Sequence, residues 1–174
     1  VIFYGHRTIL PLHDGIEAIV ENGRVVFAAK IDKLNKNSEL NVLKIGSNSL
    51  FENSVEVIIS KSPIYNRTDE SLVVNGFISS GNLVGDIYSR SRLIGDKIQM
   101  YGINKSLKKL FIDNKIPKEY RDIIPILCDD VGIIYVPFVG VADRVFDKES
   151  SDGFFVQTIF KTIEKERWSC SNEK

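Results

Sequence analysis

Residues 90–117 carry the most informative pattern of the chain, which reads RSRLIGDKIQMYGINKSLKKLFIDNKIP. The first part of this pattern, with the residues just before it, predicts two strands, Asp86 to Arg92 and Lys97 to Tyr101. Ile94-Gly95-Asp96 lies between them and predicts a turn, because glycine adopts backbone conformations that are closed to other residues. The chain is therefore expected to fold back on itself at residue 95.

The second part of the pattern predicts helix. Asn104 can accept hydrogen bonds from the free amides of a first helical turn, so we expect the helix to begin there. An apolar stripe follows at helical spacing and consists of Leu107, Leu110 and Phe111. A second short helix is expected over residues 118–122, because Pro117 suits a first helical position and a helix stops before Pro125.

The segments on either side of this region predict strands. Residues 16–20 and 24–27 are apolar runs that flank Asn22-Gly23, a pair typical of the tight turn of a hairpin. Further strands are expected at residues 40–45, 55–59, 72–74, 133–136 and 154–160. Asn75-Gly76 is expected to end the strand that precedes it.

Ser79-Ser80-Gly81-Asn82 is the best candidate for an internal boundary, because it is small, polar and contains glycine. We therefore expect a strand-rich first subdomain at residues 1–80, a second subdomain at residues 81–163 and a polar tail at residues 164–174. The predicted fold class is α+β, in which short helices of the second subdomain pack on a mostly antiparallel sheet.

The composition is that of a globular protein. The chain has 174 residues, 23 basic and 23 acidic, with 43% hydrophobic and 26% charged residues. No stretch approaches the ~18–20 apolar residues of a membrane-spanning helix, so we expect no membrane partner. Cys128 and Cys170 stand isolated, which favours a reduced, cytoplasmic location. The chain does not begin with Met, and we interpret it as a piece of a longer protein.

Motifs for catalysis are missing from the sequence. It contains no Walker A pattern, no glycine-rich dinucleotide loop and no nucleophile elbow. His6 and His13 are its only histidines, and neither has a cysteine partner at metal-ligand spacing. We therefore expect this chain itself to hold no catalytic residue, no metal and no cofactor.

Positive charge is concentrated in residues 90–121, which contain nine basic and three acidic side chains, a net charge of +6. The rest of the chain holds 14 basic and 20 acidic residues, a balance of −6. A positive patch can neutralise phosphates and release counterions, which is the usual electrostatic basis of nucleic-acid binding. Arg90 and Arg92 lie two apart on the expected strand and would point to one face. The alternative is a solvated helix face, since lysines commonly coat exposed helices.

The residues of this segment resemble a known family. Residues 90–98 resemble the R-x-R-x-x-G-D-[RK]-I motif that opens the C-terminal domain of tRNA(Ile)-lysidine synthase. Residues 105–117 look like its K-x-L-K-[KD]-x-F-I-D-x-K-I-P helix and turn, and residues 121–125 like its R-D-x-x-P element. Residues 133–136 resemble its I-I-W-V strand, and residues 10–16 are similar to the L-P-x-G strand of the preceding subdomain.

The resemblance implies a function. The family uses ATP and lysine to convert the wobble cytidine of an isoleucine tRNA to lysidine. Its ATP-binding domain lies N-terminal and carries an S-G-G-x-D-S loop, which this sequence lacks. ATP (with Mg) and lysine would therefore be used by that missing domain. This chain would be the part that recognises tRNA(Ile) on its acceptor-stem side, inactive by itself.

The resemblance also implies which residues contact tRNA. Carried over by motif position, the candidates are Arg90, Arg92, Lys97, Lys105, Lys108, Lys109, Lys115 and Arg121. The alternative reading is a protein-interaction or dimerisation module of the same enzyme, in which the strand-rich first subdomain pairs strand edges or packs apolar faces in a homodimer.

Overall fold

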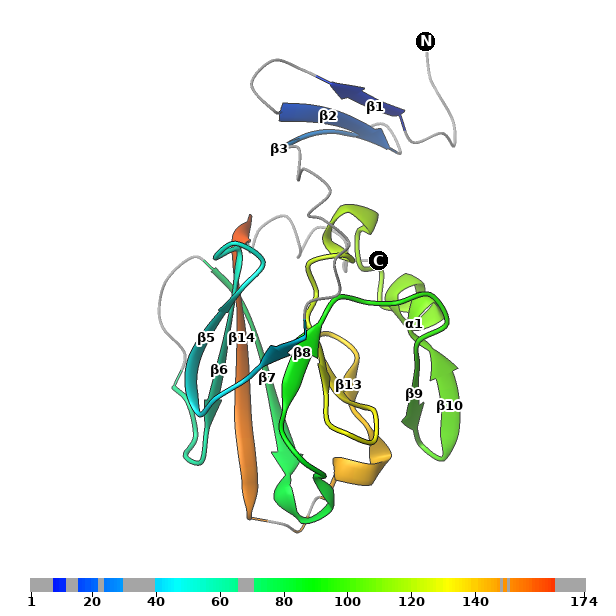
Figure 1. The fold of residues 1–174 in the computed structure, drawn as a ribbon. Coiled ribbons are helices and arrows are strands. Elements are labelled where there is room, and N and C mark those ends of the chain that lie inside the picture. Colours follow the sequence, from blue (N-terminus) through cyan, green and yellow to red (C-terminus); the bar gives the residue numbers. More distant parts are fainter. Residues whose placement is uncertain are drawn as a thin grey trace. The chain divides into compact units, whose positions relative to one another are not determined.

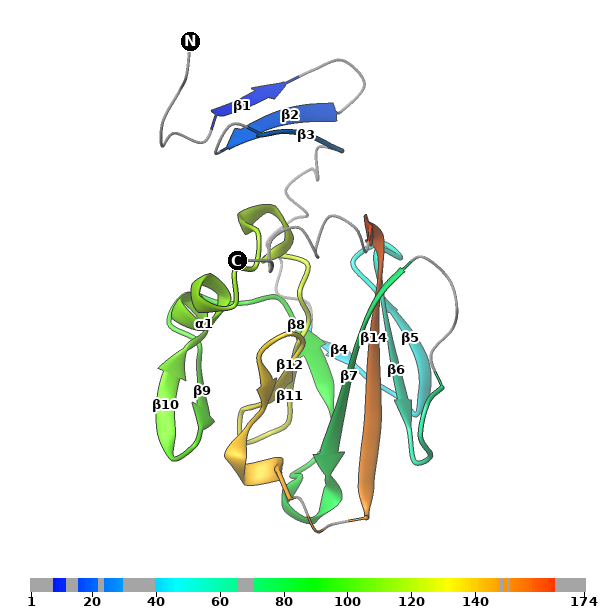
Figure 2. The ribbon, with the colours of Figure 1, turned by 180° about the vertical axis from the view of Figure 1, so that it is seen from behind.

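The structure is a computed structural model and describes residues 8–11, 16–21, 24–29, 40–65, 71–147, 149 and 151–164. The chain forms two compact units, residues 1–36 and 37–174. Figures 1 and 2 show the elements of both units from opposite sides. The division that we expected at residue 80 lies inside the second unit.

The first unit contains a three-stranded antiparallel sheet in the order β1-β2-β3. Its strands are β1 (Thr8–Pro11), β2 (Ile16–Glu21) and β3 (Arg24–Ala29). β2 pairs with β3 up to Glu21 and Arg24, so the predicted hairpin is confirmed. Its turn residues Asn22-Gly23 lie outside the described residues, as do the two histidines and the predicted tail from residue 165 onward.

The second unit contains a four-stranded antiparallel sheet in the order β5-β6-β14-β7. Its strands are β5 (Gly46–Leu50), β6 (Val55–Ser60), β7 (Ser71–Ser79) and β14 (Gly153–Glu164). β6 alternates between buried and half-buried residues, as expected for a strand with one face on the core. Because β14 lies between β6 and β7, a strand from beyond residue 150 completes a sheet made of residues before 80. This pairing explains why the chain does not divide at residue 80.

β7 continues through Asn75-Gly76, where the sequence predicted its end. Asn75 pairs with Gln157 of β14, and Gly76 pairs with Val156. The ring of Tyr135 lies so close to Gly76 that a Cβ atom at this position would be 2.5 Å from Tyr135 Cε2. The glycine therefore makes room for an aromatic ring, and the predicted strand end is wrong.

A five-stranded antiparallel sheet has the order β13-β12-β11-β8-β4. Its strands are β4 (Asn41–Val42), β8 (Tyr88–Arg90), β11 (Ile126–Cys128), β12 (Ile133–Val136) and β13 (Gly140–Val141). β12 has the predicted bounds, whereas β4 and β8 are shorter than predicted. β12 and β13 contact β7, so the five-stranded sheet packs against the four-stranded sheet, as Figure 2 shows.

A two-stranded hairpin of β9 (Lys97–Met100) and β10 (Ile103–Ser106) leads directly into α1 (Leu107–Asp113). Its turn residues Tyr101 and Gly102 have φ angles of 57° and 73°, which suit the tight turn of a hairpin. The chain therefore turns back at Gly102 and pairs as a strand up to Ser106, which is the N-cap of α1. The predicted helix start at Asn104 is wrong.

The other helical elements of the described residues are single 3₁₀ turns, η2 (Ser80–Asn82), η3 (Lys118–Tyr120) and η4 (Asp143–Val145). η3 occupies the place of the second predicted helix. The predicted α+β class is confirmed, because the described residues form mostly antiparallel sheets with one α-helix. Within the described part of the chain, no helix is long and apolar enough to cross a membrane.

Candidate nucleic-acid interface

Arg90 is held inside the fold by Asp96. Its Nη1 and Nη2 atoms donate to the Asp96 carboxylate over 2.8 and 2.9 Å, and Nη1 also donates to the Ser91 carbonyl. The two side chains are only 14% and 11% exposed. The hydrogen bonds to Asp96 raise the pKa of the Arg90 guanidinium. Arg90 is thus engaged in an internal ion pair and presents little surface to a ligand.

The carboxylate of Asp96 also shapes the turn after β8. Its Oδ2 atom accepts the backbone N–H of Leu93 at 2.8 Å. The Asp96 carbonyl accepts the N–H of Leu107, the first residue of α1, at 3.0 Å. Asp96 therefore fixes the positions of β8, of the turn and of α1 relative to one another.

Arg92 lies beyond the end of β8 and in different surroundings from Arg90. Its guanidinium carbon is 5.9 Å from the centroid of the Phe111 ring. Its Nε atom is buried and has no hydrogen-bond partner among the described residues. The expectation that both arginines share one strand face is wrong, because β8 ends at Arg90. Arg92 has no carboxylate partner in the described part of the chain, so its charge is available to an anion.

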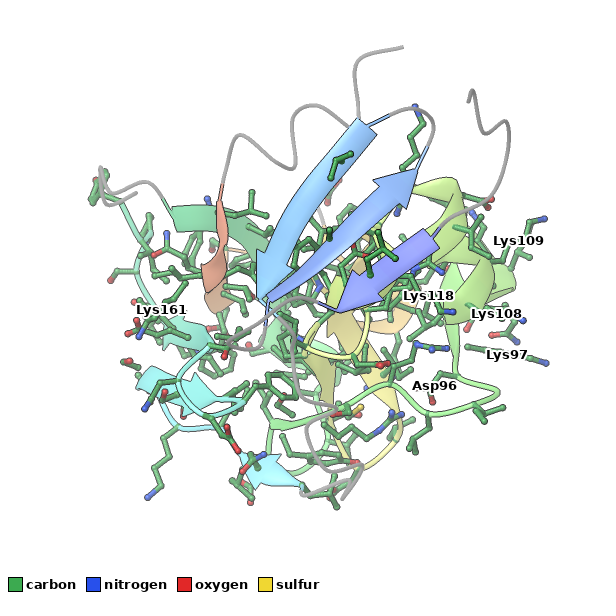
Figure 3. All side chains as sticks on the ribbon, turned by 90° about the horizontal axis from the view of Figure 1, so that it is seen from above. Asp96, Lys97, Lys108, Lys109, Lys118 and Lys161 are labelled. Atoms are coloured by element: carbon green, nitrogen blue, oxygen red, sulfur yellow. The ribbon has the colours of Figure 1, made fainter. Side chains whose placement is uncertain are left out.

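α1 turns its lysines outward because its apolar residues are buried. Leu107 and Phe111 are fully buried, which fixes the orientation of the helix. Lys108 and Lys109 lie on the opposite side and are exposed. Figure 3 shows both beside Lys97 of β9, pointing away from the body of the unit. We call Lys97, Lys108 and Lys109 the lysine cluster.

The other three residues that were predicted to contact tRNA lie in different surroundings from one another. Lys105 of β10 is half-buried, and its Nζ atom lies 4.9 Å from the ring centroid of Tyr101. Lys115 is exposed just after α1 and has a φ of 53°. Arg121 is half-buried, and its Nε atom donates to the Ile116 carbonyl over 2.9 Å. The lysine cluster is thus the most accessible group of the predicted cations.

Two exposed residues near these cations were not among the predicted contacts. Lys118 of η3 lies on the same side of the unit as the lysine cluster in Figure 3, whereas Lys161 lies on the opposite side. Tyr101 at the hairpin tip is 81% exposed. The charge count of residues 90–121 already contained Lys118, but the family motif gave it no role.

A pocket of about 260 Å³ is lined by none of the candidate cations. Its lining consists of Leu43, Ile45, Ile59, Ser80, Leu83, Gly85, Asp86, Ile87 and Phe154. Because this lining is mostly apolar and its one charged group is a carboxylate, the pocket does not suit phosphate. Among the described residues, no group of three or more His, Cys, Asp or Glu could hold a metal ion.

Comparisons with known proteins place the cationic segment in a family. A family model described as "TilS substrate C-terminal domain" matches residues 88–158. The tRNA(Ile)-lysidine synthase of Bacillus licheniformis is 37% identical over 93 residues, which cover 50% of this chain and 19% of that protein. The synthase of Clostridium tetani is 30% identical over 140 residues, which cover 78% of this chain and 30% of that protein.

A solved structure supports the fold. The crystal structure of a TilS C-terminal domain superposes with a TM-score of 0.54 at 19% identity, covering 74% of this chain and all of that one. The second unit thus has the α+β fold of a TilS C-terminal domain, and its residues 88–158 match the family of substrate C-terminal domains. The chain carries a C-terminal region of the tRNA(Ile)-lysidine synthase family. It spans less than a third of the length of the two synthases compared above.

Proposed function

We propose that this chain is the tRNA-recognition part of a ligase that converts the wobble cytidine of an isoleucine tRNA to lysidine. It would contact the acceptor-stem side of the tRNA. The observation that carries this proposal is the lysine cluster, three exposed amino groups from β9 and α1 on one side of a TilS substrate C-terminal domain. The names of the relatives supply the substrate, tRNA(Ile).

The lysine cluster suits the sugar-phosphate backbone of a duplex. Each ammonium group that neutralises a phosphate releases a counterion, so binding weakens as salt rises. Buried Leu107 and Phe111 hold α1 in place, and the Asp96 carbonyl accepts the N–H of its first residue, so the backbone positions of the lysine cluster are fixed before binding. A positioned array of charges loses less conformational entropy on binding than a flexible tail does.

Catalysis belongs, in this proposal, to another domain of the same protein. ATP (with Mg) and lysine would bind there, and this chain by itself would form no lysidine. A homodimer and a cytoplasmic location stay predictions. Sedimentation of the purified chain tests the first of these, since a sedimentation coefficient independent of concentration and equal to that of a monomer would contradict it.

The proposal is tested by the affinity of this chain for an acceptor-stem RNA duplex at two salt concentrations. If three lysines each neutralise a phosphate, affinity should fall roughly 40-fold between about 50 and 200 mM salt. A duplex that fails to bind at low salt, or that binds equally at both concentrations, would contradict the proposal. Fluorescence anisotropy of a labelled duplex gives both values.

A further inference from the structure

The β9–β10 hairpin has a polar face that points to solvent. Lys97 is paired with Ser106 and Gln99 with Asn104. All four side chains are exposed, whereas Ile98 between them is buried. Because side chains alternate across a strand, these four lie on one face of the hairpin. We call Lys97, Gln99, Asn104 and Ser106 the outer face.

The hairpin is held at both ends. At its tip, the Asp143 carboxylate accepts the N–H groups of Tyr101 and Gly102 over 2.8 and 2.7 Å. At its base, the Asp96 carbonyl accepts the N–H of Leu107, and Asp96 is itself held by Arg90. The outer face is therefore presented in a fixed position, as a surface that reads another molecule must be.

The chemistry of the outer face suits a partner with hydroxyl groups. Each of the two facing amides, Gln99 and Asn104, can donate and accept hydrogen bonds, and so can the Ser106 hydroxyl. None of these three side chains has a hydrogen-bond partner among the described residues. The outer face contains no carboxylate, so nothing on it repels phosphate.

We propose that the outer face lies in the minor groove of an A-form RNA stem and hydrogen-bonds to ribose 2′-hydroxyl groups. This inference rests on the proposed function. The minor groove of A-form RNA is wide and shallow and displays 2′-hydroxyls, which donate and accept hydrogen bonds as the amides do. Lys97, at the edge of the outer face, also belongs to the lysine cluster, which continues onto α1 and reaches phosphates on one side of the groove. The outer face distinguishes RNA from DNA, and the lysine cluster supplies affinity for either.

The test compares two stems of one sequence, one all RNA and one in which the 2′-hydroxyls are removed. The wild-type chain should bind the RNA stem about tenfold more tightly at the same salt concentration. The variant Gln99→Ala/Asn104→Ala should lose about tenfold in affinity for RNA and nearly nothing for the deoxy stem. Its salt dependence should not change, because no charge is removed.

A matched variant separates this role from that of the lysine cluster. Lys108→Gln/Lys109→Gln should weaken binding of both stems by the same factor and leave the preference for RNA intact. Equal binding of the two stems by the wild-type chain would overturn the inference and leave the proposed function standing. An unchanged RNA preference in Gln99→Ala/Asn104→Ala, with the fold verified by circular dichroism, would also overturn it. Failure of both stems to bind would overturn the proposed function together with the inference.

Discussion

Arg90 and Arg92 stand two residues apart and have different physical roles. Arg90 is locked to Asp96 by two hydrogen bonds, whereas Arg92 lies over Phe111 with no carboxylate partner in the described part of the chain. The spacing R-x-R therefore combines one residue that shapes the turn with one whose charge has no carboxylate partner among the described residues and is available to an anion.

Replacing Arg90 should destabilise the fold. Arg90→Gln leaves the Asp96 carboxylate mostly buried without its cation, which typically costs about 3–5 kcal/mol. Arg92→Gln should cost much less and instead weaken binding of the RNA stem. Urea unfolding of both variants measures the two free energies of unfolding. Equal losses of stability would contradict this division of roles.

The lysines of α1 should act on binding alone. Lys108→Gln/Lys109→Gln removes two exposed charges, so the salt slope for RNA binding should fall by about two and affinity by at least tenfold at low salt. The control is Lys44→Gln/Lys161→Gln, which removes one exposed charge from the segment before β5 and one exposed charge from β14, where Lys161 pairs with Glu56 over 3.1 Å. A similar loss in the control would mean that net charge, not the cluster, governs binding.

Asp129 makes the stability of the fold depend on pH. Its carboxylate is fully buried and accepts hydrogen bonds from the Val84, Val131 and Gly132 amides and from Arg144 at 2.6 Å. Burial raises the pKa of Asp129, but these hydrogen bonds outweigh it and leave the pKa below the ordinary value. Because the pKa of Asp129 is lower in the folded state, its ionised carboxylate stabilises the fold. This contribution to the free energy of unfolding is complete above the ordinary pKa of about 4 and is lost as pH falls below it.

The substitution Asp129→Asn should therefore change the pH dependence of stability. The variant should be less stable than wild type at pH 7, and the difference should shrink between about pH 5 and pH 2. Urea unfolding at several pH values measures the difference in the free energy of unfolding between the two proteins. A difference that stays constant over this range would show that ionisation of Asp129 does not stabilise the fold.

At the scale of elements, the β9–β10 hairpin depends on a single carboxylate at its tip. Asp143→Ala leaves the N–H groups of Tyr101 and Gly102 without their acceptor. We expect faster amide hydrogen exchange in residues 97–106, little change elsewhere and a several-fold loss of RNA affinity. Asp147→Ala is the control, because Asp147 accepts the Glu149 N–H and makes no hydrogen bond to the hairpin among the described residues. Unchanged exchange at the hairpin in Asp143→Ala would refute the role of this carboxylate.

The sequence correctly predicted those secondary-structure elements that are determined by residues close together in the chain. The hairpin of β2 and β3 follows from a turn pair between apolar runs, and α1 follows from its apolar stripe. The end of a strand at Gly76 was predicted incorrectly, because the reason for that glycine is Tyr135, almost sixty residues away. The helix start at Asn104 failed for a similar reason, since pairing with β9 outweighs the capping preference of a single residue.

The candidate site was predictable in its charges and not in its contacts. The concentration of lysines and the family motif are visible in the sequence, and the exposure of Lys108 and Lys109 follows from the buried stripe of α1. That Arg90 is paired with Asp96 could not be read from spacing, because both residues also fit a surface role. The outer face escaped prediction because β10 was interpreted as helix.

At the scale of the whole molecule, the zero net charge hides a strong asymmetry. Residues 90–121 carry +6 and the rest carries −6, so a neutral total is compatible with a phosphate-binding surface. The negative remainder would limit indiscriminate binding to nucleic acid.

The second unit should fold without the first. A chain that begins at residue 37 should keep one cooperative unfolding transition and its RNA affinity, since residues 37–174 form a compact unit. A chain that ends at residue 152 should lose the transition, because β14 contributes buried Val156, Ile159 and Phe160. Circular dichroism during thermal unfolding compares the two. A cooperative transition in the chain without β14 would refute this account.

The position of β14 has a consequence for biosynthesis. β6 and β7 leave the ribosome long before β14 is made, and until then each has an unpaired edge that β14 later covers. The nascent chain must therefore pass through a stage in which the edges of β6 and β7 are unpaired and prone to aggregation, because β14 has not yet been translated. Chaperones that shield such edges during translation would matter more for this domain than for one whose sheets close in the order of synthesis.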